Sequence, residues 1–392
     1  MDVEAPLPPV ERLAPDQVDS DHGRRVIGRG AAVLRNGGLV AFPTETVYGL
    51  GALPSRPDAL ERLFQVKGRP KDKPLIMHVA DEGMARPLAA RWPATAQALA
   101  GAFWPGPLTL VLPAAAVVPA AVRGGGPTVG IRVPAHPIAL ALVREVGEPL
   151  AAPSANPSGR PSPTTARHVV EDLGGLVDLV IDGGPAPVGV ESTVIDLAQD
   201  PPVLLRPGAV PVEALRRHLP ALRIHSRLVL HHNEGTQADE DAQGAGSAAP
   251  DIKYRQYAPQ APVVLVLGEN LTEVHNIIRN LLTAAEAAGL RTGLLLATEL
   301  GDDWPRPRVA WGSLRQPETL AAGLYEGLRR LDGEGVDLIV THGVEPAGIG
   351  LAVRNRLVEA AVEILRPGSS IAGIIAKAKA KQRVPRTEGG RM

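Results

Sequence analysis

The 392-residue chain contains no cysteine and only 3% aromatic residues. It also has no run of about twenty apolar residues, the length that a membrane-spanning helix needs. Without cysteine it can form no disulfide, no thiolate metal site and no cysteine nucleophile. Its first residues, MDVEAPLPPVERLAPDQ, are acidic and interrupted by proline, unlike a signal peptide, which is basic and then apolar. We therefore expect a cytoplasmic protein that does not contact a membrane.

An excess of charge of one sign is also lacking. The chain has 41 Lys and Arg residues against 42 Asp and Glu residues, which gives a formal net charge of -1. Proteins that follow nucleic-acid phosphates carry an excess of cations, so extensive nucleic-acid binding is not indicated, although a local basic patch is compatible with the composition. The length and the 44% of hydrophobic residues are sufficient for two domains with separate cores.

Several common functional motifs are missing. The sequence has no P-loop, no His-Glu-x-x-His zinc motif and no Gly-x-Ser-x-Gly nucleophile elbow. No Gly-x-Gly-x-x-Gly fingerprint follows the first predicted strand of the second half, so a dinucleotide site is not supported. The pair His231-His232 lies in a polar linker, where solvated side chains are more typical than metal ligands.

What is present is a dense cluster of polar chemistry in residues 37–79. The apolar run 39–42 stops at Pro43 and predicts a buried strand that ends at the sheet edge where α/β folds bind ligands. The following turn offers the hydroxyls, carboxylate and phenol of Thr44, Glu45, Thr46 and Tyr48. A predicted helix then leads into four cations before a second strand at 75–79; these cations are Lys67, Arg69, Lys71 and Lys73.

The four cations have two interpretations. Lys and Arg are favoured at a helix C-terminus by the helix dipole, and charge runs are usually solvated. Alternatively, the compact charges of Lys and the planar fork of Arg form an anion clamp that suits a polyphosphate. Taken alone, the run favours the solvated loop.

Later predicted strands also end in polar or cationic groups. Arg132 lies among apolar neighbours in the strand predicted at 128–134, where it either reaches solvent at the sheet edge or binds an anion. The loop 153–164 is rich in hydroxyls and proline, and a helix cap at Thr164 or Thr165 would not explain Ser154 and Asn156. By contrast, the Trp-Pro-Gly-Pro turn in 103–113 is interpreted as purely architectural. The polar positions at five strand or loop edges are Thr46, Arg132, Ser154, Ser192 and Arg206. Their convergence predicts one polar cavity in an α/β domain.

The chain is expected to divide into five segments. Residues 1–20 form a loose lead-in, 21–222 an α/β domain, and 223–260 a polar linker. The end of the linker, Lys253 to Pro259, is either a strap that closes a site or the entry to the next domain. Strands and helices alternate over 261–367, which predicts a smaller three-layer domain with a mostly parallel sheet, and 368–392 is a basic tail.

Seven motifs in order resemble the YrdC-like threonylcarbamoyl-AMP synthases. They are FPTETVYGLG, KGRPKDKPLIMHV, FWPGPLTLVLP, VGIRVP, APSANPSGRPSPT, ESTVID and LLRPG. The long form of that family adds a linker with a KYRHYAP-like segment and a Rossmann-like second domain. This chain has KYRQYAP, with Gln256 in place of His. The resemblance covers about residues 24–365 and implies a YrdC-like twisted open sheet with flanking helices in the first domain.

The resemblance implies a nucleotidyltransferase. Such an enzyme condenses L-threonine, bicarbonate or CO2, and ATP into threonylcarbamoyl-AMP and releases pyrophosphate. The product passes to a separate transferase complex that modifies an adenosine beside the tRNA anticodon, and a weak contact with tRNA is compatible with this role. Mg2+ is expected with the triphosphate, but no protein ligand for it can be named.

The resemblance also assigns residues. The catalytic constellation comprises Lys67, Arg69, Ser154 and Asn156. The ATP-binding residues are Arg69, Lys73, Thr128, Ser154, Ser162, Arg206 and Tyr257. The threonine-binding residues are Thr46, His78, Arg132, Ser192 and the backbone at Ala152. Without the resemblance, His78 is equally well interpreted as a strand histidine satisfied by the backbone.

Two other functions are compatible with parts of the sequence. A double-stranded RNA or tRNA binding module would use the cations of residues 67–73, but the near-zero net charge argues against it. A carbamoyl-transfer domain of the hydrogenase-maturation type shares the YrdC-like fold. It would need zinc-finger and acylphosphatase modules, and the lack of cysteine argues against it.

Overall fold

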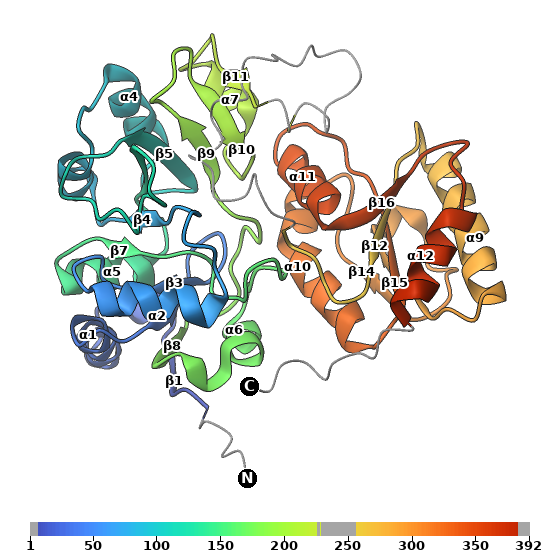
Figure 1. The fold of residues 1–392 in the computed structure, drawn as a ribbon, viewed down its shortest axis with the longest axis horizontal. Coiled ribbons are helices and arrows are strands. Elements are labelled where there is room, and N and C mark those ends of the chain that lie inside the picture. The colour runs from blue at the N-terminus through green and yellow to red at the C-terminus, as the bar shows by residue number, and fades with distance from the viewer. Residues whose placement is uncertain (1–6, 226–227, 229–255, 383–392) are drawn as a thin grey trace.

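The computed structural model describes residues 7–225, 228 and 256–382. Figure 1 shows two α/β bodies side by side, an N-terminal one in blue to green and a C-terminal one in yellow to red. The predicted α/β fold class is confirmed. Within the described ranges, no helix is both long enough and apolar enough to cross a membrane.

The larger sheet of the N-terminal domain has seven strands in the order β11-β10-β9-β5-β6-β4-β7. Its pairings are both parallel and antiparallel, as in β4 with β6 and β5 with β6. The strands are β4 (Ile76–His78), β5 (Leu108–Pro113), β6 (Thr128–Arg132), β7 (Leu150–Ala151), β9 (Thr193–Asp196), β10 (Val203–Arg206) and β11 (Arg223–Ile224). The apolar runs at 75–79, 108–112, 128–134, 149–152, 191–196 and 203–206 predict strands, and each is present in this sheet to within a few residues.

The smaller sheet has four strands in the order β1-β8-β2-β3. The strands are β1 (Val10–Arg12), β2 (Val40–Phe42), β3 (Gly49–Gly51) and β8 (Leu179–Asp182). Isolated bridges pair Gly49 with Ser154 and Ala52 with Ala151, so that the two sheets meet beside the loop after β7. The carboxyl end of β2 therefore lies close to that loop.

Capping and helix-ending residues define the helices of this domain. Ser20 caps α1 by accepting a hydrogen bond from Gly23 N, and Thr165 caps α6 through His168 N. Helix α2 ends at Gly68, whose φ of 55° lies in the left-handed region that glycine adopts without strain. The helices are α1 (Asp21–Arg35), α2 (Pro57–Lys67), α5 (Pro137–Val146), α6 (Ala166–Leu173) and α7 (Val212–Arg216), with short 3-10 turns η1 (Pro15–Gln17) and η3 (Gly174–Leu176).

Residues 84–99 are Ala-rich and amphipathic, which predicts one helix, but the structure divides this segment. It becomes α3 (Glu82–Ala85), a 3-10 turn η2 (Arg86–Leu88) and α4 (Ala94–Phe103). Pro87 and Pro93 lie at the two breaks, because proline cannot donate the backbone hydrogen bond of a helix interior.

The C-terminal domain is built on a five-stranded, fully parallel sheet in the order β14-β13-β15-β12-β16. Val263 and Leu265 of β12 belong to the core with α10 and α11, whereas Val264 and Val266 belong to the core with α9 and α12. The sheet is thus covered on both faces (Figure 1), which confirms the predicted three-layer arrangement. Its elements are β12 (Val263–Val266), α9 (Leu271–Ala287), β13 (Thr292–Leu296), η5 (Thr298–Leu300), β14 (Arg308–Ala310), α10 (Pro317–Gly333), β15 (Leu338–His342), α11 (Gly350–Ala360), β16 (Ala361–Leu365) and α12 (Ala372–Gln382).

Three segments differ from the sequence-based expectation. Residues 10–12 of the supposedly loose lead-in form β1, which pairs in parallel with β8. The sequence pattern predicts one helix over 351–365, but residues 361–365 form β16. Val362 and Ile364 favour a strand, and the edge of β12 is available for pairing. Part of the expected basic tail forms α12, which buries Ile374 against the second core. Most of the linker and the last ten residues lie outside the described residues.

The two domains meet through close backbone contact, apolar packing and ion pairs. Gly189 has a φ of 79°, and a Cβ on it would lie 2.4 Å from Ala321 O of α10, so a larger residue would push the domains apart. Val47 and Val190 of the first domain join the core of the second. Ion pairs across the interface include Arg329–Asp172, Arg160–Asp332, Arg167–Glu326 and Arg356–Glu191.

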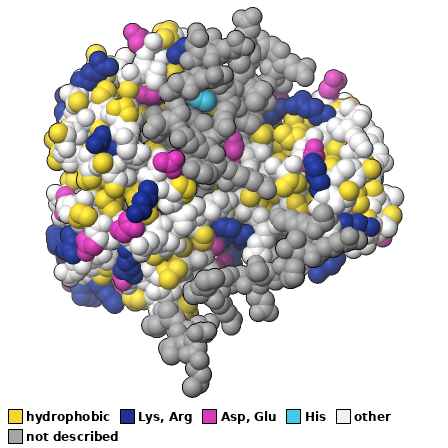
Figure 2. Space-filling model, viewed as in Figure 1, with side chains coloured by type: hydrophobic (Ala, Val, Ile, Leu, Met, Phe, Trp, Pro, Cys, Tyr) yellow, Lys and Arg dark blue, Asp and Glu magenta, His cyan; other side chains and the backbone are white. Residues whose placement is uncertain are grey.

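Charges of both signs are interspersed on the face shown in Figure 2, where dark-blue and magenta side chains alternate over short distances. On this face the described residues form no broad basic surface. The picture agrees with the near-zero net charge.

His342, at the end of β15, makes the stability of the protein sensitive to acid. Its Nε2 accepts from Ala297 N at 2.9 Å, and its Nδ1–H donates to Gly343 O at 2.8 Å. Burial is the main cause that lowers its pKa from 6.5 to about 4. The folded state therefore keeps His342 neutral, whereas the unfolded chain takes up a proton below pH 6.5. The contribution of neutral His342 to the unfolding free energy is fully present above pH 6.5. It is lost as the pH falls from 6.5 toward 4.

We expect His342→Gln, which retains an acceptor but cannot titrate, to weaken this acid sensitivity. Between pH 7.5 and pH 4 the wild-type chain should lose on the order of 3 kcal/mol more unfolding free energy than the variant loses. Urea unfolding at a series of pH values measures the difference. His22→Gln, at an exposed histidine, is the matched control. Equal acid sensitivity in wild type and His342→Gln would contradict the expectation.

Candidate active site

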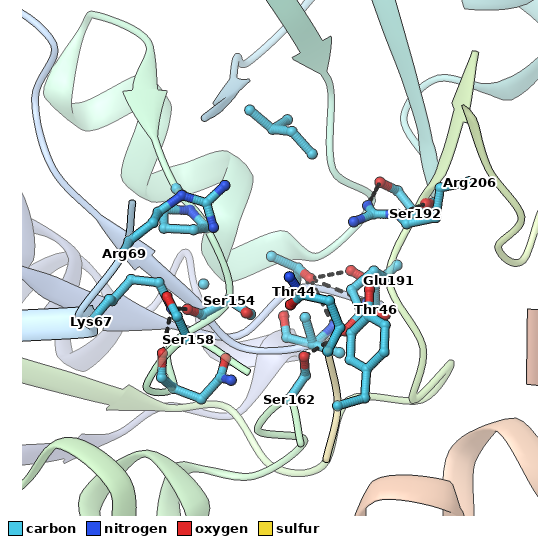
Figure 3. Close-up of a pocket in the computed structure, with 18 of the residues that line it drawn as sticks. Thr44, Thr46, Lys67, Arg69, Ser154, Ser158, Ser162, Glu191, Ser192 and Arg206 are labelled. Atoms are coloured by element: carbon cyan, nitrogen blue, oxygen red, sulfur yellow. Dashed lines mark hydrogen bonds between the residues drawn. The ribbon is translucent and has the colours of Figure 1, made fainter. Parts of the chain in front are cut away.

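One pocket of roughly 730 Å³, open solvent at its mouth included, lies where the two sheets of the N-terminal domain meet. Figure 3 shows its labelled side chains pointing into a shared space from several elements. They come from the turn after β2, the end of α2, the loop after β7, the loop before β9 and the end of β10.

Lys67, the last residue of α2, ties that helix to the loop after β7. Its Nζ donates to Ser154 O at 2.5 Å and also to Asn156 O, and Ser158 N donates to Lys67 O at 2.8 Å. The side chain of Asn156 donates to Arg160 O at 2.9 Å and closes the loop on itself. Lys67 is only 3% exposed. A buried ammonium therefore lies beside the hydroxyl-rich loop.

Arg132, at the end of β6, has its guanidinium fork aimed at the turn after β2. Its Nη2 lies 2.6 Å from Glu45 Oε1, and its Nη1 donates to Thr46 Oγ1 at 3.0 Å. Its Nε donates to Gly106 O at 3.2 Å, so the Trp-Pro-Gly-Pro turn, interpreted as purely architectural, also contacts this residue. Arg132 is buried, and of the two earlier alternatives the structure supports an anion partner rather than solvent.

His78 lies next to Arg132 on the neighbouring strand β4. Burial, and second the charge of Arg132, lower its pKa to about 3, so the imidazole is neutral at ordinary pH. Its Nδ1 has no hydrogen-bond partner among the described residues. His78 therefore offers a neutral group to the pocket rather than a charge.

Ser192 and Arg206 form the opposite wall. Arg206 Nε donates to Ser192 O at 3.0 Å and its Nη2 donates to Ser192 Oγ at 3.1 Å. The Ser192 hydroxyl also lies 2.8 Å from Thr109 Oγ1 of β5. These contacts hold the cation at the strand end and restrict the Ser192 hydroxyl to one orientation.

The structure brings together all the site residues predicted from the sequence except Lys73 and Thr128. Those two are not among the residues that line the pocket. The hypothesis of a four-cation clamp is therefore corrected: only Lys67 and Arg69 of the run line the pocket, and the exposed Lys71 pairs with Glu61 at 2.7 Å. A loop has no fixed side-chain period, so sequence spacing could not tell which cations turn inward.

Polar lining residues to which the sequence reasoning gave no role include Thr44, Ser158, Arg160, Glu191 and Gln256. Glu45 was noted in the turn after β2 but was not assigned a role. A signal for the two carboxylates was available, because Glu45 lies inside FPTETVYGLG and Glu191 begins ESTVID. The part of the strap expectation that falls on residues 226–227 and 229–255 lies outside the described residues, but Tyr257 at its end lines the pocket.

Acidic and histidine side chains do not gather into a metal site in the part of the chain that the structure describes. No group of three or more such residues could hold an ion there. An Mg2+ ion that accompanies a triphosphate is held largely by phosphate oxygens and water. The expectation of Mg2+ thus stays a prediction without a named protein ligand.

Comparisons with known proteins agree over both domains. A profile of the Sua5, YciO and YrdC proteins, described as "Telomere recombination", matches residues 32–208. A second profile, "Threonylcarbamoyl-AMP synthase, C-terminal domain", matches residues 210–362. The threonylcarbamoyl-AMP synthase of Pyrococcus abyssi is 45% identical over 327 residues, which are 83% of this chain and 91% of that protein.

The corresponding synthase of Bacillus subtilis is 43% identical over 338 residues, 86% of this chain and 92% of its own length. A crystal structure of P. abyssi Sua5 complexed with L-threonine has a TM-score of 0.80 at 43% identity, and the match covers 92% of this chain and 98% of that chain. The similarity therefore extends to the arrangement of both domains.

Fold and pocket define a two-domain α/β protein whose N-terminal domain carries a pocket lined by cations and hydroxyls, with residues 256 and 257 on one wall. The chain belongs to the threonylcarbamoyl-AMP synthase family, in its two-domain form, which confirms the resemblance seen in the sequence motifs. It is accordingly a member of a family of enzymes.

Proposed function

We propose that the protein synthesises L-threonylcarbamoyladenylate from L-threonine, bicarbonate or CO2, and ATP, with release of pyrophosphate. The observation that carries this proposal is the shared pocket, in which Lys67, Arg69, Arg132 and Arg206 surround a hydroxyl-rich loop. All the reactants except CO2 bear negative charge at neutral pH. A pocket that gathers cations and hydroxyl donors favours exactly such a set of ligands.

The threonine subsite is assigned to the Arg132 end of the pocket. Threonine is a zwitterion, and the buried pair of Arg132 and Glu45 carries a matching pair of charges. The guanidinium fork would bind the substrate carboxylate, and Glu45 would accept a hydrogen bond from its ammonium. The remaining polar contacts would come from Thr46, neutral His78, Ser192 and the backbone at Ala152.

The ATP subsite is assigned to the wall that runs from the end of α2 to Tyr257. The proposed contacts are Arg69, Ser154, Ser162, Arg206 and Tyr257, which line the pocket, together with Lys73 and Thr128, which do not. Contacts from the last two residues would require a shift of the segments that carry them. Mg2+ would supply charge neutralisation at the phosphates.

The proposed reaction has two bond-forming steps. The ammonium group of threonine loses a proton to solvent, and the amine nitrogen attacks the carbon of CO2 as one C=O π bond opens. The nitrogen then loses a second proton to solvent, which leaves an anionic carbamate. A carbamate oxygen then attacks the α-phosphorus of ATP, the bond from that phosphorus to the bridging oxygen breaks, and pyrophosphate leaves. The first step produces an anion, and the second brings that anion to the polyphosphate. The protein therefore contributes orientation and charge stabilisation by Lys67 and Arg69, and the loop of Ser154 and Asn156 fixes the geometry.

The product would serve a separate transferase complex that modifies tRNA beside the anticodon, as the family resemblance implies. Threonylcarbamoyl-AMP is a mixed anhydride of a carbamate and a phosphate, a class of compound that transfers its acyl group readily. A weak contact with tRNA is compatible with this role but is not required for the synthesis.

The test is a pyrophosphate-release assay with ATP and bicarbonate, with or without single amino acids. We expect release that depends on threonine and is much weaker with serine or valine, together with a product of the mass of threonylcarbamoyl-AMP. No threonine-dependent release, combined with tight and salt-sensitive tRNA binding, would support the RNA-binding alternative instead.

A further inference from the structure

A carboxylate from the pocket wall is held by the second domain. Tyr325 of α10 donates through its hydroxyl to both oxygens of Glu191, at 3.1 and 3.0 Å, and Arg356 Nε of α11 donates to Glu191 Oε2 at 2.8 Å. Arg356 is 1% exposed and Tyr325 is fully buried. Burial, and second the charge of Glu191, raise the pKa of Tyr325, so its hydroxyl keeps its proton and donates. We call Glu191, Tyr325 and Arg356 the interdomain clasp.

The clasp reaches two residues of the proposed ATP subsite. The hydroxyl of Ser162 donates to Glu191 Oε1. The ring of Tyr257 lies close to both clasp residues of the second domain, 5.0 Å from Arg356 Cζ and 5.7 Å from the ring of Tyr325. Figure 3 shows Ser162 and Glu191 on the same side of the pocket.

Tyr257 is also fixed through its backbone. Its φ of 60° is in the left-handed region, which is strained for a residue with a side chain and persists only where the surroundings enforce it. The next residue, Ala258, donates its N–H to Gly159 O at 2.8 Å in the loop after β7. The second domain thus holds the ring of Tyr257, and the first domain holds the backbone beside it.

The direction of the hydrogen bond from Ser162 limits what this residue can bind. An ionised carboxylate only accepts, so the single proton of the Ser162 hydroxyl is committed to Glu191. Ser162 then offers only lone pairs to a ligand. A phosphate oxygen has no proton to give to them, whereas a ribose hydroxyl or the adenine amino group has.

A buried ion pair is a weak source of stability, because desolvation offsets most of its Coulombic attraction. Gly189 and the apolar contacts already join the domains. Arg356 makes further hydrogen bonds to Asn355 Oδ1 and, at 3.1 Å, to Pro207 O, next to Arg206. Its contacts therefore converge on the pocket wall rather than on the interface in general.

We propose that the C-terminal domain builds the nucleoside end of the ATP subsite: Tyr325 and Arg356 are positioning residues that fix Glu191, orient Ser162 as a hydrogen-bond acceptor, and seat the Tyr257 ring against the nucleoside. This inference rests on the proposed function in that it takes ATP as a ligand of the pocket. It assigns the nucleoside to the clasp and leaves the phosphates to the Lys67 and Arg69 side.

Calorimetric binding of ATP and of inorganic tripolyphosphate to the full-length protein tests the inference. Tyr325→Phe removes the hydroxyl that donates to Glu191 and keeps the ring. The double variant Glu191→Gln with Arg356→Met removes both charges together, so that neither is left buried and unpaired. Glu326→Gln, next to Tyr325 on α10, changes an interdomain contact to Arg167 and serves as the matched control.

We expect the Kd for ATP to rise about ten-fold in Tyr325→Phe and more in the double variant, because charge-assisted hydrogen bonds contribute about 1.5–3 kcal/mol. Affinity for tripolyphosphate should stay within about two-fold of wild type, and Glu326→Gln should match wild type for both ligands. In the pyrophosphate-release assay, KM for ATP should rise while KM for threonine does not.

Equal losses for ATP and tripolyphosphate would overturn the inference, because they would indicate general loosening of the pocket. Wild-type ATP affinity in both clasp variants would overturn it as well, and would leave the proposed function standing. A wild-type chain that binds no ATP would overturn the proposed function and this inference with it.

Discussion

Lys67→Met is expected to lower kcat/KM for pyrophosphate release by about 100- to 1,000-fold, the usual effect of removing one donor that stabilises developing charge. Methionine keeps most of the side-chain volume but removes the ammonium, which donates to Ser154 O and Asn156 O. The variant thus loses a positive charge at the pocket and the anchor of the loop after β7. Steady-state kinetics with varied ATP measures the effect.

Lys71→Met is the matched control for that change. Lys71 belongs to the same cation run, but its side chain is 70% exposed and pairs with Glu61. An exposed pair of this kind contributes at most about 1 kcal/mol, so activity should stay within about two-fold of wild type. Equal losses from the two substitutions would show that the run acts through its total charge and not through the position of Lys67.

Folding of Lys67→Met must be checked separately. Two buried carbonyl oxygens lose a donor, which costs about 1–3 kcal/mol of unfolding free energy. Circular dichroism at the assay temperature should still show a folded protein. A variant that is unfolded there would assign Lys67 to structure.

Arg132→Lys is expected to raise KM for threonine by about 10- to 100-fold and to leave KM for ATP unchanged. The substitution keeps a positive charge opposite Glu45 but replaces the planar fork, which binds a carboxylate through two parallel hydrogen bonds. Arg132→Ala is a poorer test, because it would leave the buried Glu45 without its partner and cost about 3–5 kcal/mol of stability. Unchanged threonine dependence in Arg132→Lys would remove this residue from the threonine subsite.

Glu45→Gln tests the other half of the threonine subsite, the proposed contact with the substrate ammonium. If Glu45 accepts a hydrogen bond from the substrate ammonium, its neutralisation should weaken binding of threonine more than binding of 3-hydroxybutyrate, which lacks the amine. In the kinetic assay, the KM for threonine and the competitive inhibition by 3-hydroxybutyrate measure the two affinities. Equal losses for the two compounds would indicate that Glu45 acts only by holding Arg132.

Sequence reasoning located the pocket because buried strands leave a strong local signal. Apolar runs flanked by polar or cationic residues predicted β2, β4, β6, β9 and β10, and polar groups at the ends of strands tend to build the ligand site of an α/β fold. It failed where local preference and tertiary pairing disagree. Residues 361–365 continue a helical pattern but pair with β12, and β1 lies in a proline-rich lead-in that offers no periodicity.

The sequence by itself determined the α/β class, the alternation that marks a second domain, and the polar strand ends, since each depends on neighbours only a few positions apart. Only the tertiary structure decided which charges are partners. Arg132 pairs with Glu45, and Arg356 pairs with Glu191 across 165 positions and two domains. Electrostatic attraction depends on distance in space and leaves no period in the chain, so these pairings become visible only once the fold has brought the groups together.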